Sequence, residues 1–200
     1  MEIRALVAAT RDDLFELRRH FHNHPELSLH ETKTIAKICA ELDRFGISYR
    51  VVPNGGVIAQ VNGALPGKTL LLRADIDALP LQESETNLLG PRDCRSKADG
   101  VMHACGHDGH TAILLTVARL LQEQRSHLKG RYLLVFEQAE EEFGGIEALM
   151  QELDATETYD GAWALHLMGS LETGKVSVDA GPRMSGPFSF SYTIQGRSGH

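Results

Sequence analysis

Nine consecutive residues carry most of the information in this sequence: Met102-His103-Ala104-Cys105-Gly106-His107-Asp108-Gly109-His110. Thiol and imidazole groups together are the ligand types that suit zinc and metals of similar softness. Cys105 and His107 are two residues apart, so on an extended loop both side chains point to one side. This motif stretch (residues 102–110) therefore predicts a metal site. The alternative is a polar loop in which Cys105 packs as a small apolar group.

On either side of the motif stretch, helical and extended patterns alternate along the chain. Apolar residues at helical spacing predict helices over residues 2–24, 31–45, 111–124 and 143–153. β-rich runs predict strands around residues 51, 57–61, 69–73, 131–136 and 161–167. The polar segment 81–104 is too long for an ordinary connection, which indicates a functional loop. This order predicts an α/β fold, with a mostly parallel mixed sheet flanked by helices.

The pattern changes after Met184. Phe188, Phe190, Tyr192 and Ile194 alternate with polar residues, which is typical of a strand with one wet face. We therefore expect a first domain over residues 1–184 and the start of a smaller α+β domain at 185–200. Because nothing after Gly196 resembles a natural ending, we expect the sequence to be the N-terminal part of a longer protein.

Composition excludes several classes of function. The formal net charge is −7, which argues against a nucleic-acid surface. No apolar run approaches the roughly 20 residues that a membrane span needs, and residues 1–4 lack the features of a secretory signal. The 3 cysteines give no disulfide framework. We expect a cytoplasmic protein without nucleic-acid or membrane partners.

Charged and imidazole side chains follow three of the predicted strands. Asp75 and Asp77 come after the first, Glu140–Glu142 after the second and His166 after the third. The carboxyl ends of parallel strands form one rim, where ligands bind in open α/β sheets. Each group also has a simpler explanation: turn aspartates, a solvated helix start or a satisfied core histidine. Their common position at strand ends favours a site.

The adjacent glutamates suit metal-assisted hydrolysis. This chemistry needs one carboxylate as a ligand and a second, unligated one as general base. Cys105, His107, one glutamate and His166 would form a mixed sulfur, nitrogen and oxygen ligand set. With one or two further ligands, that set suffices for two metal ions.

These motifs together resemble the M20 metallopeptidase family, in particular its amidohydrolase branch with the hippurate hydrolases and indole-acetyl-amino-acid hydrolases. The resemblance rests on an ordered set of segments: residues 73–80 (Arg-Ala-Asp-Ile-Asp-Ala-Leu-Pro), the motif stretch, Glu140-Glu141, His166 and the closing residues 196–200. It implies a zinc-exopeptidase-like catalytic domain interrupted by a smaller lid domain that usually dimerises.

The resemblance also implies roles for individual residues. Cys105, His107, Glu141 and His166 match metal ligands of a site that holds two divalent ions per subunit. Zinc, manganese, cobalt and nickel are not distinguished. The catalytic matches are Glu140 as general base, Asp77 as the carboxylate behind the ligands, and His200 as a lid histidine that binds substrate or stabilises the oxyanion.

The sequence departs from the family pattern in three places. The family usually reads Gln-Pro-Ala-Glu-Glu-Gly where this chain has residues 137–142, so Glu142 is an extra acid beside the expected base and ligand. Asp75 stands where the wider family has a metal-ligating histidine. The family's last ligand, a histidine near the C-terminus, has no counterpart in this sequence.

These observations predict a metal-dependent amidohydrolase that cleaves N-acyl amino acids or similar amides, with metal-activated water and Glu140 as base. A carboxypeptidase or dipeptidase of the same family is the alternative within this chemistry. A non-catalytic metal-binding or dimerisation protein with the same fold is the alternative from another class. The expected partners are a small peptide-like substrate and a second copy of the chain, joined through the lid domain.

Overall fold

The computed structural model describes residues 2–142, 145–184, 186, 190–197 and 199. These residues divide into two units, Met1–Leu167 and Met168–His200. Among its described residues the second unit has no helix or strand. The strand predicted at 188–194 is therefore not formed over 190–194, because an isolated strand has no hydrogen-bonding neighbour. Ser185, Pro187 and residues 188–189 lie outside the described residues, so the predicted domain boundary stays a prediction.

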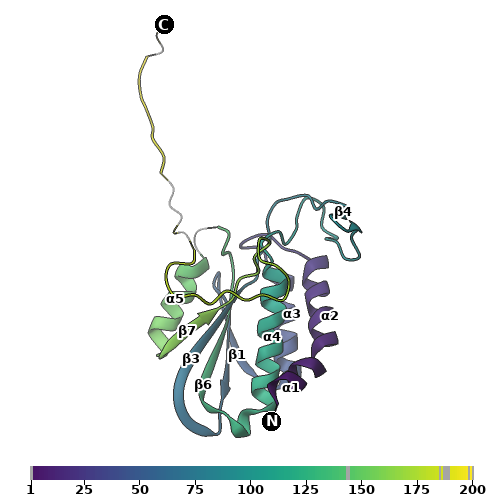
Figure 1. Cartoon of the computed structure of the whole chain (residues 1–200). Coiled ribbons are helices and arrows are strands. Elements are labelled where there is room, and N and C mark those ends of the chain that lie inside the picture. The colour runs from purple at the N-terminus through teal and green to yellow at the C-terminus, as the bar shows by residue number, and fades with distance from the viewer. Residues whose placement is uncertain (1, 143–144, 185, 187–189, 198, 200) are drawn as a thin grey trace. The chain divides into compact units, whose positions relative to one another are not determined.

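The first unit is built around a five-stranded sheet in the order β1-β2-β6-β3-β7 (Figure 1). Its strands are β1 (Ser48–Val52), β2 (Gly56–Asn62), β3 (Leu65–Asp75), β6 (Lys129–Glu137) and β7 (Gly161–Ala164). The predicted α/β class with a mixed sheet between helices is confirmed. Strand β3 runs parallel to β6 and β7, whereas β2 runs antiparallel to β1 and β6. The sheet is less parallel than predicted, because Asn54, at φ 58°, turns β1 and β2 into a hairpin and β2 joins β6 in the antiparallel sense.

Helices cover both faces of this sheet. Figure 1 shows α2, α3 and α4 on one face and α5 on the other. The helices are α1 (Ile3–Ala9), α2 (Arg11–Asn23), α3 (Thr32–Phe45), α4 (His107–Glu123) and α5 (Gly145–Thr156), with a 3₁₀ turn at Arg125–His127. None of the described helices is both long and apolar enough to cross a membrane.

Each face of the sheet has its own apolar core. On the α4 side, fully buried residues such as Phe21, Ile38 and Leu115 pack against alternate residues of β2, β3 and β6. On the α5 side, Leu149 and Leu153 pack against the residues that point the other way. Strands buried on both faces explain the nearly continuous apolar runs in the sequence.

The largest differences between the predicted and observed helices are at Thr10 and at the start of α4, and α5 also ends at Thr156, three residues later than predicted. The first helix breaks at Thr10, whose hydroxyl donates to the carbonyl of Val7 at 3.0 Å and competes with the helical pattern. Helix α4 begins at His107, four residues earlier than predicted, after Gly106 at φ 94°. Cys105 and His107 therefore do not share an extended loop. Instead, His107 and His110 lie three residues apart on one helix face.

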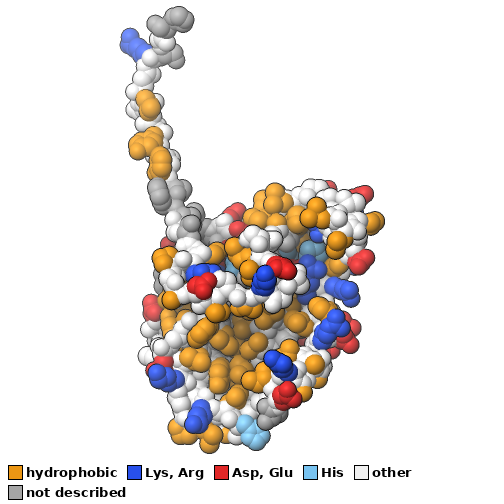
Figure 2. Space-filling view, viewed as in Figure 1, with side chains coloured by type: hydrophobic (Ala, Val, Ile, Leu, Met, Phe, Trp, Pro, Cys, Tyr) orange, Lys and Arg blue, Asp and Glu red, His pale blue; other side chains and the backbone are white. Residues whose placement is uncertain are grey.

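The segment 81–104 contains two short strands, β4 (Thr86–Asn87) and β5 (Gly90–Pro91), joined by the fully exposed Leu88 and Leu89. At the other side of the unit, β7 pairs with β3 alone among the described residues. Apolar side chains gather on the face between α4 and α5 (Figure 2). Trp163 of β7 is 67% exposed, so this edge of the sheet is apolar and uncovered in the first unit.

Candidate metal centre

The parallel strands bring the predicted residues to one rim. Asp75, the last residue of β3, pairs with Glu137 at the end of β6. On the other side of β3, Arg73 pairs with Ala164, the last residue of β7. The segments that follow these strands carry Asp77, Glu140–Glu142 and His166. The common edge expected from the sequence is therefore present.

His107 lies at the centre of this rim and is 1% exposed. Its Nδ1 is 3.0 Å from both the carbonyl oxygen and the carboxylate Oδ1 of Asp77. Both of these atoms only accept, so Nδ1 carries a proton, and in the neutral ring Nε2 holds a lone pair. Nε2 is buried without a hydrogen-bond partner among the described residues. A histidine held by a carboxylate at one nitrogen and free at the other is the usual arrangement of a metal ligand.

Three carboxylates face the free nitrogen of His107. Nε2 lies 3.6 Å from Asp75 Oδ2, 3.8 Å from Glu140 Oε2 and 3.8 Å from Glu141 Oε1. Oε1 of Glu141 is also buried without a hydrogen-bond partner in the described part of the chain. A buried acceptor without a donor is costly, and a cation between Glu141 and His107 would satisfy both atoms.

Cys105 and His166 also lie close to His107. The sulfur of Cys105 lies 3.6 Å from Nε2 of His166. Nδ1 of His166 donates to the carbonyl of Leu167 at 2.8 Å, so its Nε2 carries the lone pair that faces the thiol. Cys105, His107 and His166 offer ligand atoms that all lie within 4.8 Å of one another, and so do His107, Glu140 and Glu141.

A tight turn after β6 places the two glutamates. Ala139 has φ 55°, an uncommon conformation for a residue with a side chain. The buried carboxylate of Glu31 stabilises this turn by accepting from the backbone N–H of Ala139 and from Nε2 of Gln138, each at 2.8 Å. The N–H of Glu141 then donates to Oδ2 of Asp77 at 2.9 Å. No pattern in the sequence pointed to Glu31.

The site concentrates negative charge. Burial, followed by the charge of Glu141, raises the pKa of the Cys105 thiol to about 12. Burial also raises the pKa of Glu141. For Asp75, burial raises the pKa, but the hydrogen bond from His110 and the charge of Arg73 outweigh it and bring the pKa down to about 2. A thiol and several carboxylates packed around imidazole nitrogens fit a divalent cation, which would neutralise their negative charge.

Asp75 has a different role from the histidine that it replaces. Its Oδ1 accepts from Nδ1 of His110 at 2.6 Å, and its Oδ2 lies 2.9 Å from a guanidinium nitrogen of Arg73. Both oxygens are thus engaged by protein groups. Glu142 is exposed, and no contact joins it to His107 among the described residues. His200 lies outside the described residues.

Two residues of the motif stretch, Asp108 and His103, belong to none of the candidate ligand groups found among the described residues. Asp108 accepts from Nδ1 of His22 at 2.8 Å and pairs with Arg18 at 2.9 Å. Nε2 of His22 is 3.0 Å from the buried Glu83. Neither ring nitrogen of His103 has a partner among the described residues, and burial lowers its pKa to about 4. This network ties α2 and the 81–104 segment to the start of α4.

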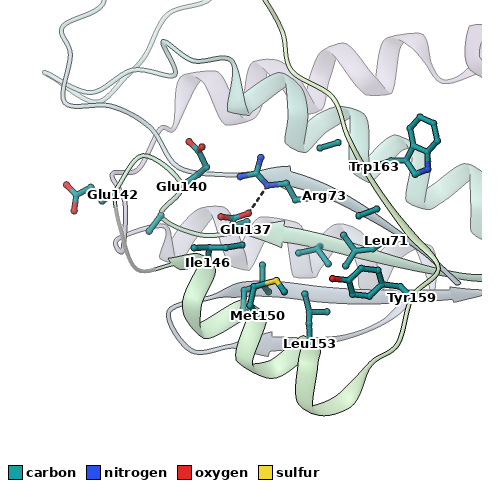
Figure 3. A pocket seen from close by; sticks show the side chains of 15 residues that line it. Leu71, Arg73, Glu137, Glu140, Glu142, Ile146, Met150, Leu153, Tyr159 and Trp163 are labelled. Atoms are coloured by element: carbon teal, nitrogen blue, oxygen red, sulfur yellow. Dashed lines mark hydrogen bonds and ion pairs between the residues drawn. The ribbon is translucent and has the colours of Figure 1, made fainter. Parts of the chain in front are cut away.

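A cleft of about 560 Å³ lies next to the rim, between α5 and the strands β3 and β7. Figure 3 shows Arg73 and Glu137 joined at one end of it, with Glu140 beside them and Glu142 pointing away. Apolar side chains line the remainder, among them Leu71, Met150, Leu153 and Trp163. The cleft thus joins a charged end at Glu140 to an apolar end.

The sequence profile of peptidase family M20/M25/M40 matches residues 71–198, which include every candidate ligand. The chain belongs to this peptidase family. The M20 resemblance inferred from the motifs is confirmed.

Individual M20 relatives agree in sequence and structure. An N-acyl-L-amino acid amidohydrolase of Geobacillus stearothermophilus is 40% identical and covers 100% of this chain and 53% of that protein. N-acetylcysteine deacetylase of Bacillus subtilis (strain 168) is also 40% identical, over 94% of this chain and 48% of its own length. The solved Bacillus subtilis YXEP protein, described as a dinuclear metal binding peptidase from the M20 family, is 40% identical with a TM-score of 0.74. That match covers 84% of this chain and 46% of YXEP. The chain spans about half the length of the curated relatives it matches.

Proposed function

We propose that the protein containing this chain is a metal-dependent amidohydrolase that cleaves the amide bond of N-acyl amino acids or closely related amides. The observation that carries the proposal is the buried, unpartnered Nε2 of His107, held by Asp77 and facing Glu140 and Glu141. The names of the M20 relatives, among them an amidohydrolase, a deacetylase and an IAA-amino acid hydrolase of Arabidopsis thaliana, support this substrate class.

Cys105, His107, Glu141 and His166 are the proposed metal ligands, for two divalent ions per subunit. A thiolate among the ligands favours zinc, but mixed sites of this kind also accept manganese, cobalt or nickel. When bound, divalent ions polarise the amide carbonyl and lower the pKa of water. The protein's own contribution is to hold the ligand atoms in place, mainly through the carboxylate of Asp77 behind His107.

Glu140 is the proposed general base. Its carboxylate is exposed and lies 3.8 Å from His107 Nε2, at the charged end of the cleft. A carboxylate there can take a proton from water and return it to the leaving amine. His200 is the proposed residue that binds substrate or stabilises the oxyanion from the lid. The apolar end of the cleft would suit an apolar acyl group or side chain.

Two other activities compete with this proposal. Thermostable carboxypeptidases 1 and 2 of Saccharolobus solfataricus are both 36% identical to this chain, which favours a carboxypeptidase as the second candidate. A non-catalytic metal-binding protein is the third, although such a protein has no need for an unligated glutamate beside the ligands.

The deciding experiment combines metal analysis with a substrate screen on one preparation of the protein. We expect about two divalent ions per chain, hydrolysis of N-acetyl or N-benzoyl amino acids, and loss of activity to a chelator with recovery on adding metal. Preferred hydrolysis of unblocked dipeptides would favour the carboxypeptidase or dipeptidase. Metal without any hydrolysis would favour the non-catalytic protein, and full activity in a metal-free sample would refute all three.

The homodimer through the lid domain and the cytoplasmic location remain predictions from the sequence. Light scattering on the purified protein tests the first. Fractionation of the source cells tests the second.

A further inference from the structure

We propose that His110 is a positioning residue: it holds the backbone of Leu167, and through it orients the imidazole of His166 toward Cys105. The inference rests on the proposed function, because it assigns His166 as a metal ligand. His110 lies close enough to Asp75 and His107 to count as a candidate ligand itself, so its hydrogen bonds must decide between the two roles.

Both ring nitrogens of His110 are engaged by protein groups. Its Nε2 accepts from the backbone N–H of Leu167 at 2.9 Å, and its Nδ1 lies 2.6 Å from Oδ1 of Asp75. A backbone N–H can only donate, so Nε2 must hold the lone pair and Nδ1 the proton. The ring is 2% exposed, and this tautomer leaves it no free lone pair for a metal. Asp75 is itself fixed by Arg73 at 2.9 Å.

The hydrogen bond from Leu167 links His110 to His166. Leu167 donates its N–H to His110, while its carbonyl accepts from Nδ1 of His166 at 2.8 Å. Nε2 of His166 then points toward the sulfur of Cys105, 3.6 Å away. The rings of His110 and His166 meet edge to face, with centroids 4.9 Å apart. A continuous set of contacts thus runs from Asp75 through His110 and Leu167 to His166.

The segment that carries His166 depends on such a support. Strand β7 ends at Ala164, two residues before His166, and the side chains of Leu165 and Leu167 are 47% and 48% exposed. Leu167 rests on the glycines of the motif stretch. A Cβ added at Gly109 would lie 2.5 Å from Leu167 Cδ1, and one at Gly106 would lie 3.3 Å from Leu167 Cβ. The glycines admit the segment to the start of α4, and His110 fixes it there.

Two substitutions separate the hydrogen bonds of His110. In His110→Gln the side-chain carbonyl can reach the place of Nε2 and accept from Leu167. In His110→Asn the amide takes the place of Nδ1, so it can donate to Asp75 but cannot reach Leu167. His110→Ala removes both bonds. The exposed His127 provides the matched control, with His127→Gln and His127→Asn.

The measurement is a cobalt(II) titration of the purified protein, followed by the thiolate-to-cobalt charge-transfer band and the visible bands that report coordination geometry. We expect His110→Asn and His110→Ala to keep the charge-transfer band of Cys105, to change the visible bands, and to lower affinity by roughly 10- to 100-fold, as for other supports of a ligand. His110→Gln should retain most of the affinity, and both His127 variants should match the wild type.

A double-mutant cycle tests whether the effect passes through His166. In a His166→Ala background, His110→Ala should lower cobalt affinity no further, because the residue that it positions is gone. Additive losses would overturn the proposal. Two other results would also overturn it. One is an equal loss of cobalt affinity in His110→Gln and His110→Asn that parallels a fall in the melting temperature of the metal-free protein. The other is unchanged cobalt affinity in all three His110 variants. If the wild type itself binds no cobalt, the proposed function fails instead.

Discussion

The histidines of α4 and the glutamates after β6 approach the same point from very different surroundings. His107 and His110 are 1% and 2% exposed, and each donates to a buried aspartate of the β3 end. Glu140 is exposed, Glu141 is half-buried, and the leucines on either side of His166, Leu165 and Leu167, are 47% and 48% exposed. The α4 half of the site is therefore fixed before any ligand arrives. The glutamate half is held by the bonds of Glu31 to Gln138 and Ala139 and of Asp77 to the N–H of Glu141, so we expect it to adjust more readily when a cation or substrate binds.

Replacing a ligand of the fixed half should have the largest effect. His107→Ala removes the central nitrogen and leaves Asp77 buried without its partner, so we expect loss of both metal and hydrolysis. Metal content by elemental analysis and circular dichroism check the change. His127→Ala is the control. A folded His107→Ala protein with a full complement of metal would show that the α4 half is not the anchor.

The two glutamates should separate chemistry from binding. Glu140→Gln keeps the shape but removes the base, so kcat should fall by roughly 10²-fold or more while metal stays bound. Glu141→Gln should lower metal content instead. The measurements are steady-state kinetics and metal analysis on both variants. The opposite result would exchange the two roles, and a dominant effect of Glu142→Gln on kcat would move the base by two residues.

Weakening the support behind His107 should have an intermediate effect. Asp77→Asn retains the shape but loses the charge that holds the imidazole, and we expect metal affinity to fall by about 10- to 100-fold. Competition with a chromogenic chelator measures the affinity. Asp99→Asn, in the exposed part of the 81–104 segment, is the matched control. Wild-type affinity in Asp77→Asn would mean that burial alone orients His107.

We expect the smallest effect on activity and metal binding from a change at the Ala139 turn, which carries Glu140 and Glu141. Glu31→Gln replaces one of two acceptors with a donor that faces Gln138 or the N–H of Ala139, and should cost about 1–3 kcal/mol of stability. Urea unfolding measures this cost, with the exposed Glu16→Gln as control. We expect kcat to fall further than metal affinity, because Glu140 follows this turn directly. Equal changes in both would remove the distinction between the two halves.

The sequence predicted those features that depend on local pattern. Apolar runs identified β3, β6 and β7, and Gly46, at φ 67°, ended α3 as expected. The position of the rim followed from the rule for parallel strands. The predicted start of α4 was wrong. Residues 107–110 form the first turn of the helix, but residues of these types are also common in loops. Their helical state depends on tertiary partners such as Asp75 and Asp77.

Other features could not be read from the sequence because they join distant segments. Asp108 is bound by His22, which is 86 residues away, and Glu31 supports a turn 108 residues away. Asp75 aligned with a family ligand, yet its oxygens are occupied by His110 and Arg73. Only the three-dimensional arrangement shows which polar groups already have partners.

The two aspartate–histidine pairs also constrain how the sheet is assembled. Asp75 and Asp77 alternate along the chain with Ala74 and Ile76, which are buried in the apolar core beneath α4. A shift of β3 by one residue would exchange these positions. Both carboxylates would then enter the core, and two buried histidines would lose their partners at a high energetic cost. Residues placed for chemistry thus also select one alignment of strand and helix, so misaligned forms of the central strand are disfavoured while the protein folds.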